Sequence, residues 1–439
     1  MGCTTLMKIG SYTPQQSSSV LYAMIGDDCS LHHDLEELTP KQQADHAENQ
    51  MLTCALQVAL VGLGKSIDRV AMAKQFEEKP WLDLFSHYVE MFQKLALTPV
   101  TSSNISFHPM DRFYEHLSED IPPVDLLNLY MVSGSNMVLH KSTKALEISR
   151  NTNSKLHFAK NAPAAGIPVP VTKIYKKSQI ADGDASQFFT KNNDGLMVKL
   201  LGLAGARNVY TAANVEDCLS VIEEYKSDLD VLLQEIVDTT RFQEMTVDLT
   251  ITPDEITINN VRKILFAGGK WVGNYIAQDL PLSDSHRRQL INVGVYARNQ
   301  GHVAEEGTNC GIDYFIDGDD VIVTEINARW TGGLFPAEFL RKLDIREPAI
   351  AFFDLVSIDK IETLQIFQQK HLYSIQKQRP FHYIPMGFCP FKMDIDGVTS
   401  ILTWQIVVGD FKSFVDACKH YFPDGGFPTA DSIRMEALE

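Results

Sequence analysis

The chain has 439 residues, which is long for one compact core, so we expect two or three packed units. Its composition is that of an ordinary globular protein, but 39 Lys and Arg stand against 56 Asp and Glu, and the formal net charge is -17. A chain this acidic offers no basic face for a phosphate backbone, so we expect no nucleic-acid partner.

The seven cysteines are scattered and odd in number and form no C-x-x-C pair, which argues against a disulfide framework or a zinc site. No basic stretch followed by an apolar segment stands at the N-terminus, so no secretory signal is expected. The longest apolar region, Ala55 to Gly64, is too short and too interrupted to span a bilayer. We therefore expect a cytoplasmic protein without a membrane partner.

Break signals divide the chain into three parts. Helical patterns at 51–76 and 81–97 precede the prolines at 122–123 and the Ser- and Gly-containing segment 132–136, and a new pattern starts near Asn151. The expected parts are an N-terminal α/β domain over 1–145, a central domain over 146–345 and a C-terminal extension over 346–439.

The central part alternates helix and strand signals, and two prolines impose an extended course after its first helix. The expected elements are a helix near 154–164, an extended stretch at 165–170, buried strands at 196–201 and 231–237, and a hairpin at 245–251 and 255–261.

A loop of small residues follows the strand that ends at 201. Small side chains let backbone N–H groups approach phosphate oxygens, while Lys199 before the loop and Arg207 near its end supply positive charge. The loop, which includes Gly202 and Gly205, is therefore a candidate for closing over phosphates. An ordinary strand end is the alternative, because Lys followed by Gly is common there.

The strand at 231–237 is apolar until the polar pair Gln234 and Glu235, and it ends at Val237. Its edge can offer backbone N–H and C=O groups to an adenine ring, and Glu244 after the next loop can reach a ribose hydroxyl or a positive group. A solvated carboxylate is the alternative interpretation of Glu244.

The most specific pattern is a hairpin across the turn residues 317–320. If the connection has an odd number of residues, Asp313 lies opposite Glu325, and Asn327 points from the same face. Two carboxylates and an amide then converge, and such hard oxygen ligands suit Mg2+ that binds chiefly through phosphates. Arg329 can stabilise a transferring phosphoryl group and is the local cation expected to compensate the carboxylates. A surface ion pair of Arg329 with Glu325 is the alternative.

In this order, these segments resemble the ATP-grasp superfamily over roughly residues 150–340. The helix before the Gly-Ile-Pro-Val-Pro stretch is similar to the family's D-K-x-x-x-K-x-x-L helix, with Ser154 in place of Asp. The run from Lys199 is similar to the K-A-D-G-L-A-A-G-K-G-V of glycinamide ribonucleotide synthetases, with Arg207 in place of the loop lysine and Asn208 in place of Gly.

The resemblance implies roles for individual residues, by position. The two lysines and the glycine loop are expected to bind the ATP phosphates. The strand at 231–237 and the first residue of the segment 244–248, which is similar to the family's E-x-x-V-D strand, are expected to bind adenine and ribose. The hairpin is expected to bind the metal, and the arginine of the segment 325–329, which matches the family's E-x-N-x-R, is expected to assist phosphoryl transfer. The residues are Lys155, Lys199, Gly202, Gly205 and Arg207 for phosphates, Gln234, Glu235, Val237 and Glu244 for the nucleoside, Asp313, Glu325 and Asn327 for Mg2+ or Mn2+, and Arg329 with Lys199 for catalysis.

The resemblance also implies a fold and a reaction. We expect an α/β (α+β) ATP-grasp fold whose glycine loop belongs to a lid at about 190–235, with substrate choice made by the first 145 and last 90 or so residues. The family's shared chemistry makes an acyl phosphate from ATP and a carboxylate. The segment Glu-Ile-Asn-Ala-Arg-Trp-Thr-Gly-Gly is more similar to amino-acid and peptide ligases than to carboxylases. We therefore expect an ADP-forming ligase of small-molecule carboxylates and amines, an amino acid or peptide among them, and allow for a homodimer.

Two other functions stay open. A nucleotide-binding sensor or interaction module could keep the fold without turnover, although the complete set of charged residues argues against it. An ATP-grasp kinase would release a stable phosphorylated product, and it would need one acceptor where a ligase needs both a carboxylate and an amine.

Overall fold

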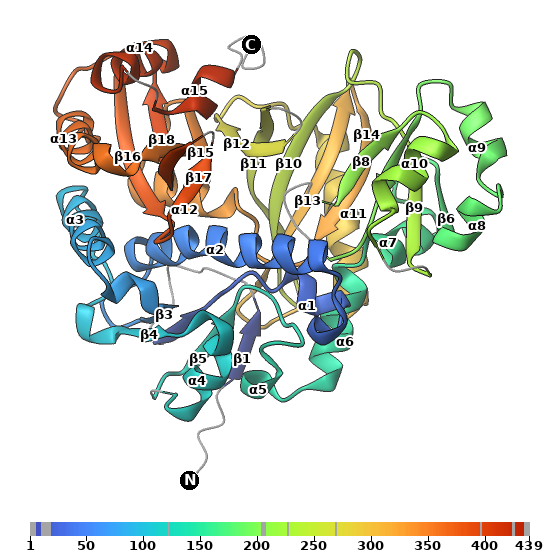
Figure 1. The fold of residues 1–439 in the computed structure, drawn as a ribbon, viewed down its shortest axis with the longest axis horizontal. Helices are drawn as coiled ribbons and strands as arrows, with labels where there is room; N and C mark the ends of the chain where they lie inside the picture. The colour runs from blue at the N-terminus through green and yellow to red at the C-terminus, as the bar shows by residue number, and fades with distance from the viewer. Residues whose placement is uncertain are drawn as a thin grey trace.

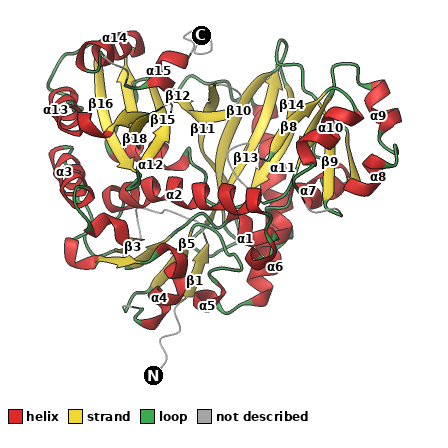
Figure 2. Ribbon diagram, viewed as in Figure 1, coloured by secondary structure: helices red, strands yellow, loops and turns green. Residues whose placement is uncertain are grey.

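The computed structural model describes residues 6–9, 19–121, 123–202, 208–225, 228–267, 270–395, 397–423 and 426–433. Within these residues the strands form three sheets, of five, nine and four strands, with helices on their faces (Figures 1 and 2). The fold class expected from the sequence, a mixture of α/β and α+β structure, is confirmed.

The N-terminal part is a parallel α/β unit. Its sheet has the order β1-β5-β2-β3-β4, and every neighbouring pair is parallel. Its elements are β1 (Leu6–Ile9), β2 (Val20–Ala23), α1 (Asp28–His32), α2 (Pro40–Leu63), β3 (Arg69–Ala73), α3 (Trp81–Lys94), β4 (Ile105–His108), α4 (Phe113–Glu119), β5 (Leu126–Leu129), α5 (Met137–His140) and α6 (Thr143–Thr152).

The helical pattern expected over 51–76 is wrong at its end, where residues 69–73 form β3. A short apolar run that is buried on both faces has no alternation, so periodicity cannot separate a strand from a helix there. The helix α2 itself begins at a capping box, in which Thr39 and Gln42 satisfy each other's backbone N–H groups.

A small antiparallel sheet with the order β6-β9-β7-β8 forms the unit at the right of Figure 1. It carries both strands expected at 196–201 and 231–237. Its elements and the helix before it are α7 (Lys155–Asn161), β6 (Thr172–Lys176), α8 (Lys177–Ala181), α9 (Ser186–Lys191), β7 (Leu196–Lys199), β8 (Val209–Ala212), α10 (Val215–Ile222) and β9 (Asp230–Glu235).

The large sheet is antiparallel, in the order β14-β13-β10-β11-β12-β15-β18-β16, with β17 paired to β18. Because β15 pairs with β12, the residues after 345 add strands to the central sheet. Its elements are β10 (Gln243–Ile251), β11 (Ile256–Ala267), β12 (Lys270–Ile276), α11 (Asp284–Asn299), β13 (Thr308–Asp317), β14 (Asp320–Asn327), α12 (Leu334–Lys342), β15 (Ala349–Ser357), α13 (Ile361–His371), β16 (Phe381–Phe388), β17 (Met393–Ile395), β18 (Val398–Gly409), α14 (Phe411–Tyr421) and α15 (Pro428–Ser432).

Strand alternation gives β10 and β13 two different faces. Met245 and Val247 on β10 and Ile312 on β13 point into an apolar core shared with α11. Thr246, which pairs with Asp313, belongs to the other face. The large sheet therefore presents polar side chains on the side away from α11, and this placement positions the candidate site.

The described residues include no helix long and apolar enough to cross a membrane. The six cysteines among them are all buried and free.

Candidate active site

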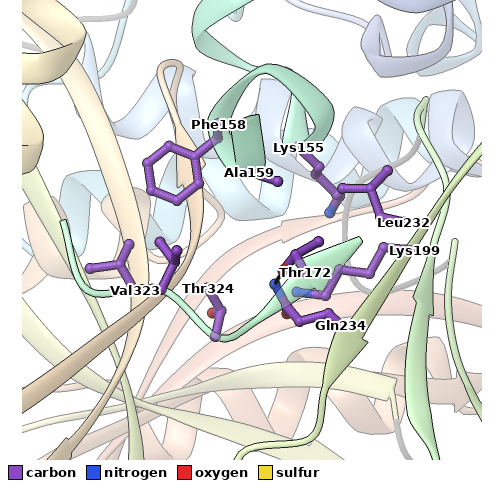
Figure 3. Close-up of a pocket in the computed structure, with 10 residues that line it drawn as sticks. Lys155, Phe158, Ala159, Thr172, Lys199, Leu232, Gln234, Val323 and Thr324 are labelled. Carbon is purple, nitrogen blue, oxygen red and sulfur yellow. Dashed lines mark hydrogen bonds between the residues drawn. The ribbon is translucent and has the colours of Figure 1, made fainter. Parts of the chain in front are cut away.

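A cleft with about 260 Å³ of empty space, part of it open to solvent, lies between α7, the small sheet and β14 (Figure 3). Three residues expected to bind nucleotide, Lys155, Lys199 and Gln234, line it. The complete lining is Lys155, Phe158, Ala159, Val169, Thr172, Lys199, Leu232, Gln234, Val323 and Thr324.

Lys155 is the first residue of α7, and the cap of that helix fixes its position. Ser154, which stands where the family has Asp, accepts a hydrogen bond from the backbone N–H of His157 through its side chain, at 3.1 Å. A serine is as good an N-cap as an aspartate, so the departure keeps the helix start intact. From there Lys155 Nζ reaches Glu325 Oε1 at 2.7 Å.

Lys199 ends β7, the strand between β8 and β9, and its side chain is buried. Burial and, next, the nearby charge of Lys155 lower the pKa of Lys199 to about 8, although the carboxylates of Glu325, Asp313 and Glu244 oppose the shift. Glu244 has the converse environment: burial and Asp313 raise its pKa to about 7. The two lysines and the three carboxylates therefore share one electrostatic environment.

The hairpin brings Asp313 opposite Glu325, as expected, but by a different route. The turn has two residues, because Asp317 pairs with Asp320. A bulge supplies the odd residue: Tyr314 pairs with Val323, so Thr324 is left unpaired, and its Oγ1 donates to the Asp313 carbonyl oxygen at 3.1 Å. The expectation of an odd-length turn is therefore wrong, while the pairing it was meant to explain is confirmed.

The remaining amide of the hairpin joins the carboxylates. Asn327 Nδ2 donates to Asp313 Oδ2 at 3.1 Å, so the three side chains expected to hold a metal lie together. Burial and the charge of Glu325 raise the pKa of Asp313 to about 6. Burial also opposes ionisation of Glu325, but the charges of Lys155 and Lys199 outweigh it and lower the pKa of that carboxyl.

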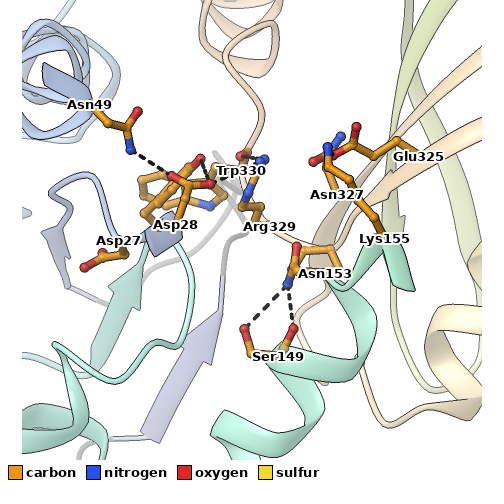
Figure 4. Close-up of polar contacts among 12 residues, drawn as sticks. Asp27, Asp28, Asn49, Ser149, Asn153, Lys155, Glu325, Asn327, Arg329 and Trp330 are labelled. Carbon is orange, nitrogen blue, oxygen red and sulfur yellow. Dashed lines mark hydrogen bonds and ion pairs between the residues drawn. The ribbon is translucent and has the colours of Figure 1, made fainter. Parts of the chain in front are cut away.

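Arg329 is not the main cation that compensates these carboxylates, and it forms no surface pair with Glu325: Lys155 pairs with Glu325 directly, and the charge of Arg329 makes a smaller contribution to the lowered pKa of that carboxyl. Arg329 Nη2 lies 3.2 Å from Asp28 Oδ1 (Figure 4). Its guanidinium lies over the Tyr130 ring, 5.4 Å from the centroid. The reason is local: β14 ends at Asn327, and the Arg329 N–H turns back to the Asn327 carbonyl oxygen. Strand alternation therefore no longer applies at Arg329.

Sequence reasoning missed the N-terminal residues that meet Arg329. Asp28 follows β2 and Tyr130 follows β5, at the carboxyl ends of neighbouring parallel strands, where open α/β sheets bind ligands. Asn49 of α2 donates to the second Asp28 oxygen at 3.1 Å. The signal was the acidic pair Asp27-Asp28, one glycine after the apolar run at 20–25 that contains β2.

Of the other residues expected to bind nucleotide, those that the structure describes do not line the cleft. Glu235 donates its backbone N–H to Val171 within the small sheet, and Val237 follows β9; neither lines the cleft. Gly202 has a φ of +110° and lies against the His33 ring, where an added Cβ would be 2.7 Å away. Gly205 and Arg207 lie outside the described residues.

The donor set fits a magnesium ion with few protein ligands. Among the described residues no three His, Cys, Asp or Glu side chains gather as a metal cage. Asp313, Glu325 and Asn327 supply two carboxylates and an amide, and Mg2+ usually takes its other ligands from water and phosphate.

Comparisons with known proteins identify the fold. No family model matches the sequence, and no curated protein matches it. The structure of carboxyaminoimidazole ribonucleotide synthase from Aspergillus clavatus complexed with ATP covers 95% of this chain and 99% of its own, at 12% identity and a TM-score of 0.54. That of N5-carboxyaminoimidazole synthetase from Staphylococcus aureus complexed with ADP covers 92% and 97%, at 10% identity and a TM-score of 0.53. This chain has an ATP-grasp fold.

The ATP-grasp fold accounts for the arrangement of the two antiparallel sheets. The small sheet carries Lys199 and Gln234, the large sheet carries the hairpin, and the cleft lies where they meet. Because α7 begins at the same cleft, Lys155 bridges the two sides of the ATP-grasp unit.

Proposed function

We propose that this chain binds MgATP in the cleft and activates a carboxylate as an acyl phosphate, which an amine captures as an amide with release of ADP and phosphate. One observation carries the proposal: Lys155 and Lys199 meet Asp313 and Glu325 in one environment. Two cations suit phosphate oxygens, and the carboxylates suit the ion that accompanies them. Both similar structures hold an adenine nucleotide.

Different residues of the cleft would bind different parts of ATP. Lys155 and Lys199 would bind the phosphates, while Phe158, Val169 and Leu232 offer apolar surface to the adenine ring. Gln234 is the polar group on that side, and its Nε2 donates to Thr172 Oγ1 at 2.9 Å, which holds the amide in place. Glu244, beside Lys199, would accept a hydrogen bond from a ribose hydroxyl.

The reaction has two bond exchanges. A carboxylate oxygen bonds to the γ-phosphorus of ATP while the bond from that phosphorus to the bridging oxygen breaks, so ADP leaves. The amine nitrogen then bonds to the acyl carbon, the carbon–oxygen bond to phosphate breaks, and the nitrogen gives up a proton. Lys199 and Lys155 place positive charge where ADP gains negative charge. Arg329 would stabilise the transferring group, and Mg2+ or Mn2+, held by the hairpin set, would supply further positive charge.

The proposed substrates are small molecules, with an amino acid or peptide supplying the carboxylate or the amine. The similarity of 325–333 to amino-acid and peptide ligases supports this choice. Asp28 and Tyr130 contact Arg329 at the carboxyl ends of strands in the N-terminal sheet. Open α/β sheets bind ligands at this edge, so we propose that a substrate binds there. We place the reaction in the cytoplasm.

The test is ADP release from MgATP across amino-acid pairs, followed by the mass of the product, with Glu325→Gln as the inactive control. A ligase releases ADP steadily only when carboxylate and amine are both supplied. A kinase releases ADP with one acceptor. If calorimetry shows that the chain binds nucleotide but no amino-acid pair gives turnover, the result would favour a nucleotide-binding sensor over a ligase.

A further inference from the structure

A fully buried ion pair lies beside the candidate site and has no part in the proposed reaction. Arg262 of β11 and Asp248 of β10 are both 0% exposed, with Nη1 2.5 Å from Oδ2. Removing two charges from water is costly, and replacing such a pair with apolar residues is often neutral or stabilising. Its presence therefore calls for a use other than stability.

The second Asp248 oxygen reaches the segment that carries Arg329. Asp248 Oδ1 accepts the Thr331 hydroxyl at 2.8 Å and the Asn309 amide at 3.1 Å. The same Asn309 Nδ2 donates to the Arg329 carbonyl oxygen at 2.9 Å. Asp248 thus holds Thr331 directly, and it holds Arg329 through Asn309.

Glycines let this segment lie directly on the ion pair. A Cβ at Gly333 would be 2.4 Å from Arg262 Nε, and one at Gly311 would be 2.1 Å from Thr331 Cγ2. Neither position has room for a methyl group. Thr331 Oγ1 also accepts the Leu334 N–H at 3.2 Å, so the start of α12 shares the same anchor.

We propose that Asp248 and Arg262 are positioning residues, which hold residues 329–331 so that Arg329 stays between the hairpin and Asp28. They touch no reacting atom. The geometry explains the use of a carboxyl group at this position: the two Asp248 oxygens accept hydrogen bonds from Arg262, Thr331 and Asn309 at once. The effect on turnover rests on the proposed function, whereas the effect on the segment does not.

The test removes the Thr331 hydroxyl, which also accepts a hydrogen bond from Arg262 Nη2 at 3.5 Å, while both buried charges stay in the chain. Thr331→Val removes the hydroxyl with little change of shape, and Thr331→Ser retains it. We expect Thr331→Val to lower kcat for ADP formation by about 10- to 100-fold, the cost of a small misplacement, with the KM for ATP changed less than about 2-fold. Thr331→Ser should stay near the wild-type kcat.

A matched control is Thr399→Val. The Thr399 hydroxyl also donates to a carboxylate, Asp394, at 2.7 Å, but on the surface of the β17–β18 hairpin. This variant should change neither kcat nor exchange near Arg329. If the role of Thr331 is purely structural, the Thr331→Val protein should have a lower melting temperature than wild type but an unchanged kcat per folded molecule. That result would overturn the proposal.

Hydrogen exchange separates this proposal from the proposed function. Backbone amides of 329–334 should exchange faster in Thr331→Val than in wild type or Thr331→Ser, whether or not a substrate pair has been found. Equal exchange in all three would overturn the positioning role even in an active ligase. If Thr331→Val does not fold, Asn309→Ala removes the other tie and is read in the same way.

Discussion

Lys155 Nζ lies 2.7 Å from Glu325 Oε1, and the two side chains are only 11% and 21% exposed. The pair joins the first residue of α7 to the hairpin strand β14. It keeps Glu325 ionised despite burial, because the lysine charges lower the pKa of that carboxyl. In the proposed function, Lys155 would bind phosphate and Glu325 would bind the metal. Binding of MgATP would therefore break this ion pair and give each residue a new partner.

A double-mutant cycle measures this pair. Lys155→Met, Glu325→Gln and the double variant should give a coupling free energy of about 1 to 3 kcal/mol in urea unfolding, because each single change leaves a buried charge without its partner. Each single variant should also lose most of its MgATP affinity in calorimetry. Additive stability changes would mean that other groups, such as Lys199, already compensate Glu325.

The buried amine of Lys199 gives ATP binding a pH dependence. Its pKa is lowered to about 8, so the free protein loses this positive charge as the pH rises from about 7 to 9. Wild-type affinity for MgATP should fall over that range. Lys199→Met should bind more weakly at pH 7, by about 1.5 to 3 kcal/mol, and lose less of its affinity as the pH rises. Parallel pH profiles in calorimetric titrations would argue against contact between Lys199 and phosphate.

Asp27 should make stability fall with rising pH. Burial is the main reason that its pKa is raised from 3.8 to about 7, although Ser135 Oγ at 2.7 Å and the Tyr114 hydroxyl both donate to it and oppose the shift. Between about pH 4 and 7 the folded protein keeps a proton that the unfolded chain has released, so the unfolding free energy decreases as the pH rises. The slope is at most about 1.4 kcal/mol per pH unit.

The variant Asp27→Asn isolates that contribution, because it cannot titrate. The unfolding free energy of wild type minus that of Asp27→Asn, measured in urea, should decrease as the pH is raised from about 5 to 7 and level off above it. A difference that is constant with pH would show that Asp27 has an ordinary pKa.

Asp354 should anchor the C-terminal helix. Its buried carboxylate in β15 accepts the backbone N–H groups of Thr429 at 2.9 Å and Ala430 at 2.8 Å, at the start of α15. Asp354→Ala should lower the unfolding free energy by about 2 to 3 kcal/mol, and amides of residues 428–433 should exchange faster. Asp410→Ala removes a comparable cap from α14 at the surface and should cost less. Equal losses would mean that burial adds nothing to the Asp354 anchor.

Local patterns in the sequence determined the elements and most of the cleft. Turn residues and apolar alternation located the two hairpins, and the positions of Lys155 and Lys199 at a helix start and a strand end brought both to the cleft. Short-range geometry decides such features, because side-chain direction follows from the periods of helix and strand.

Tertiary structure decided the faces and the distant partners. Asp313 and Glu325 share a face only because Thr324 bulges out of β14; in an unbroken two-residue hairpin, a one-residue shift would have turned Glu325 to the opposite face. Nothing near Arg329 in the sequence indicates Asp28, since the two meet only when the N-terminal sheet packs against the end of the hairpin. The buried pair of Asp248 and Arg262 likewise depends on register between two strands. Periodicity cannot express such relations, because they arise from how elements pack and not from how each one forms.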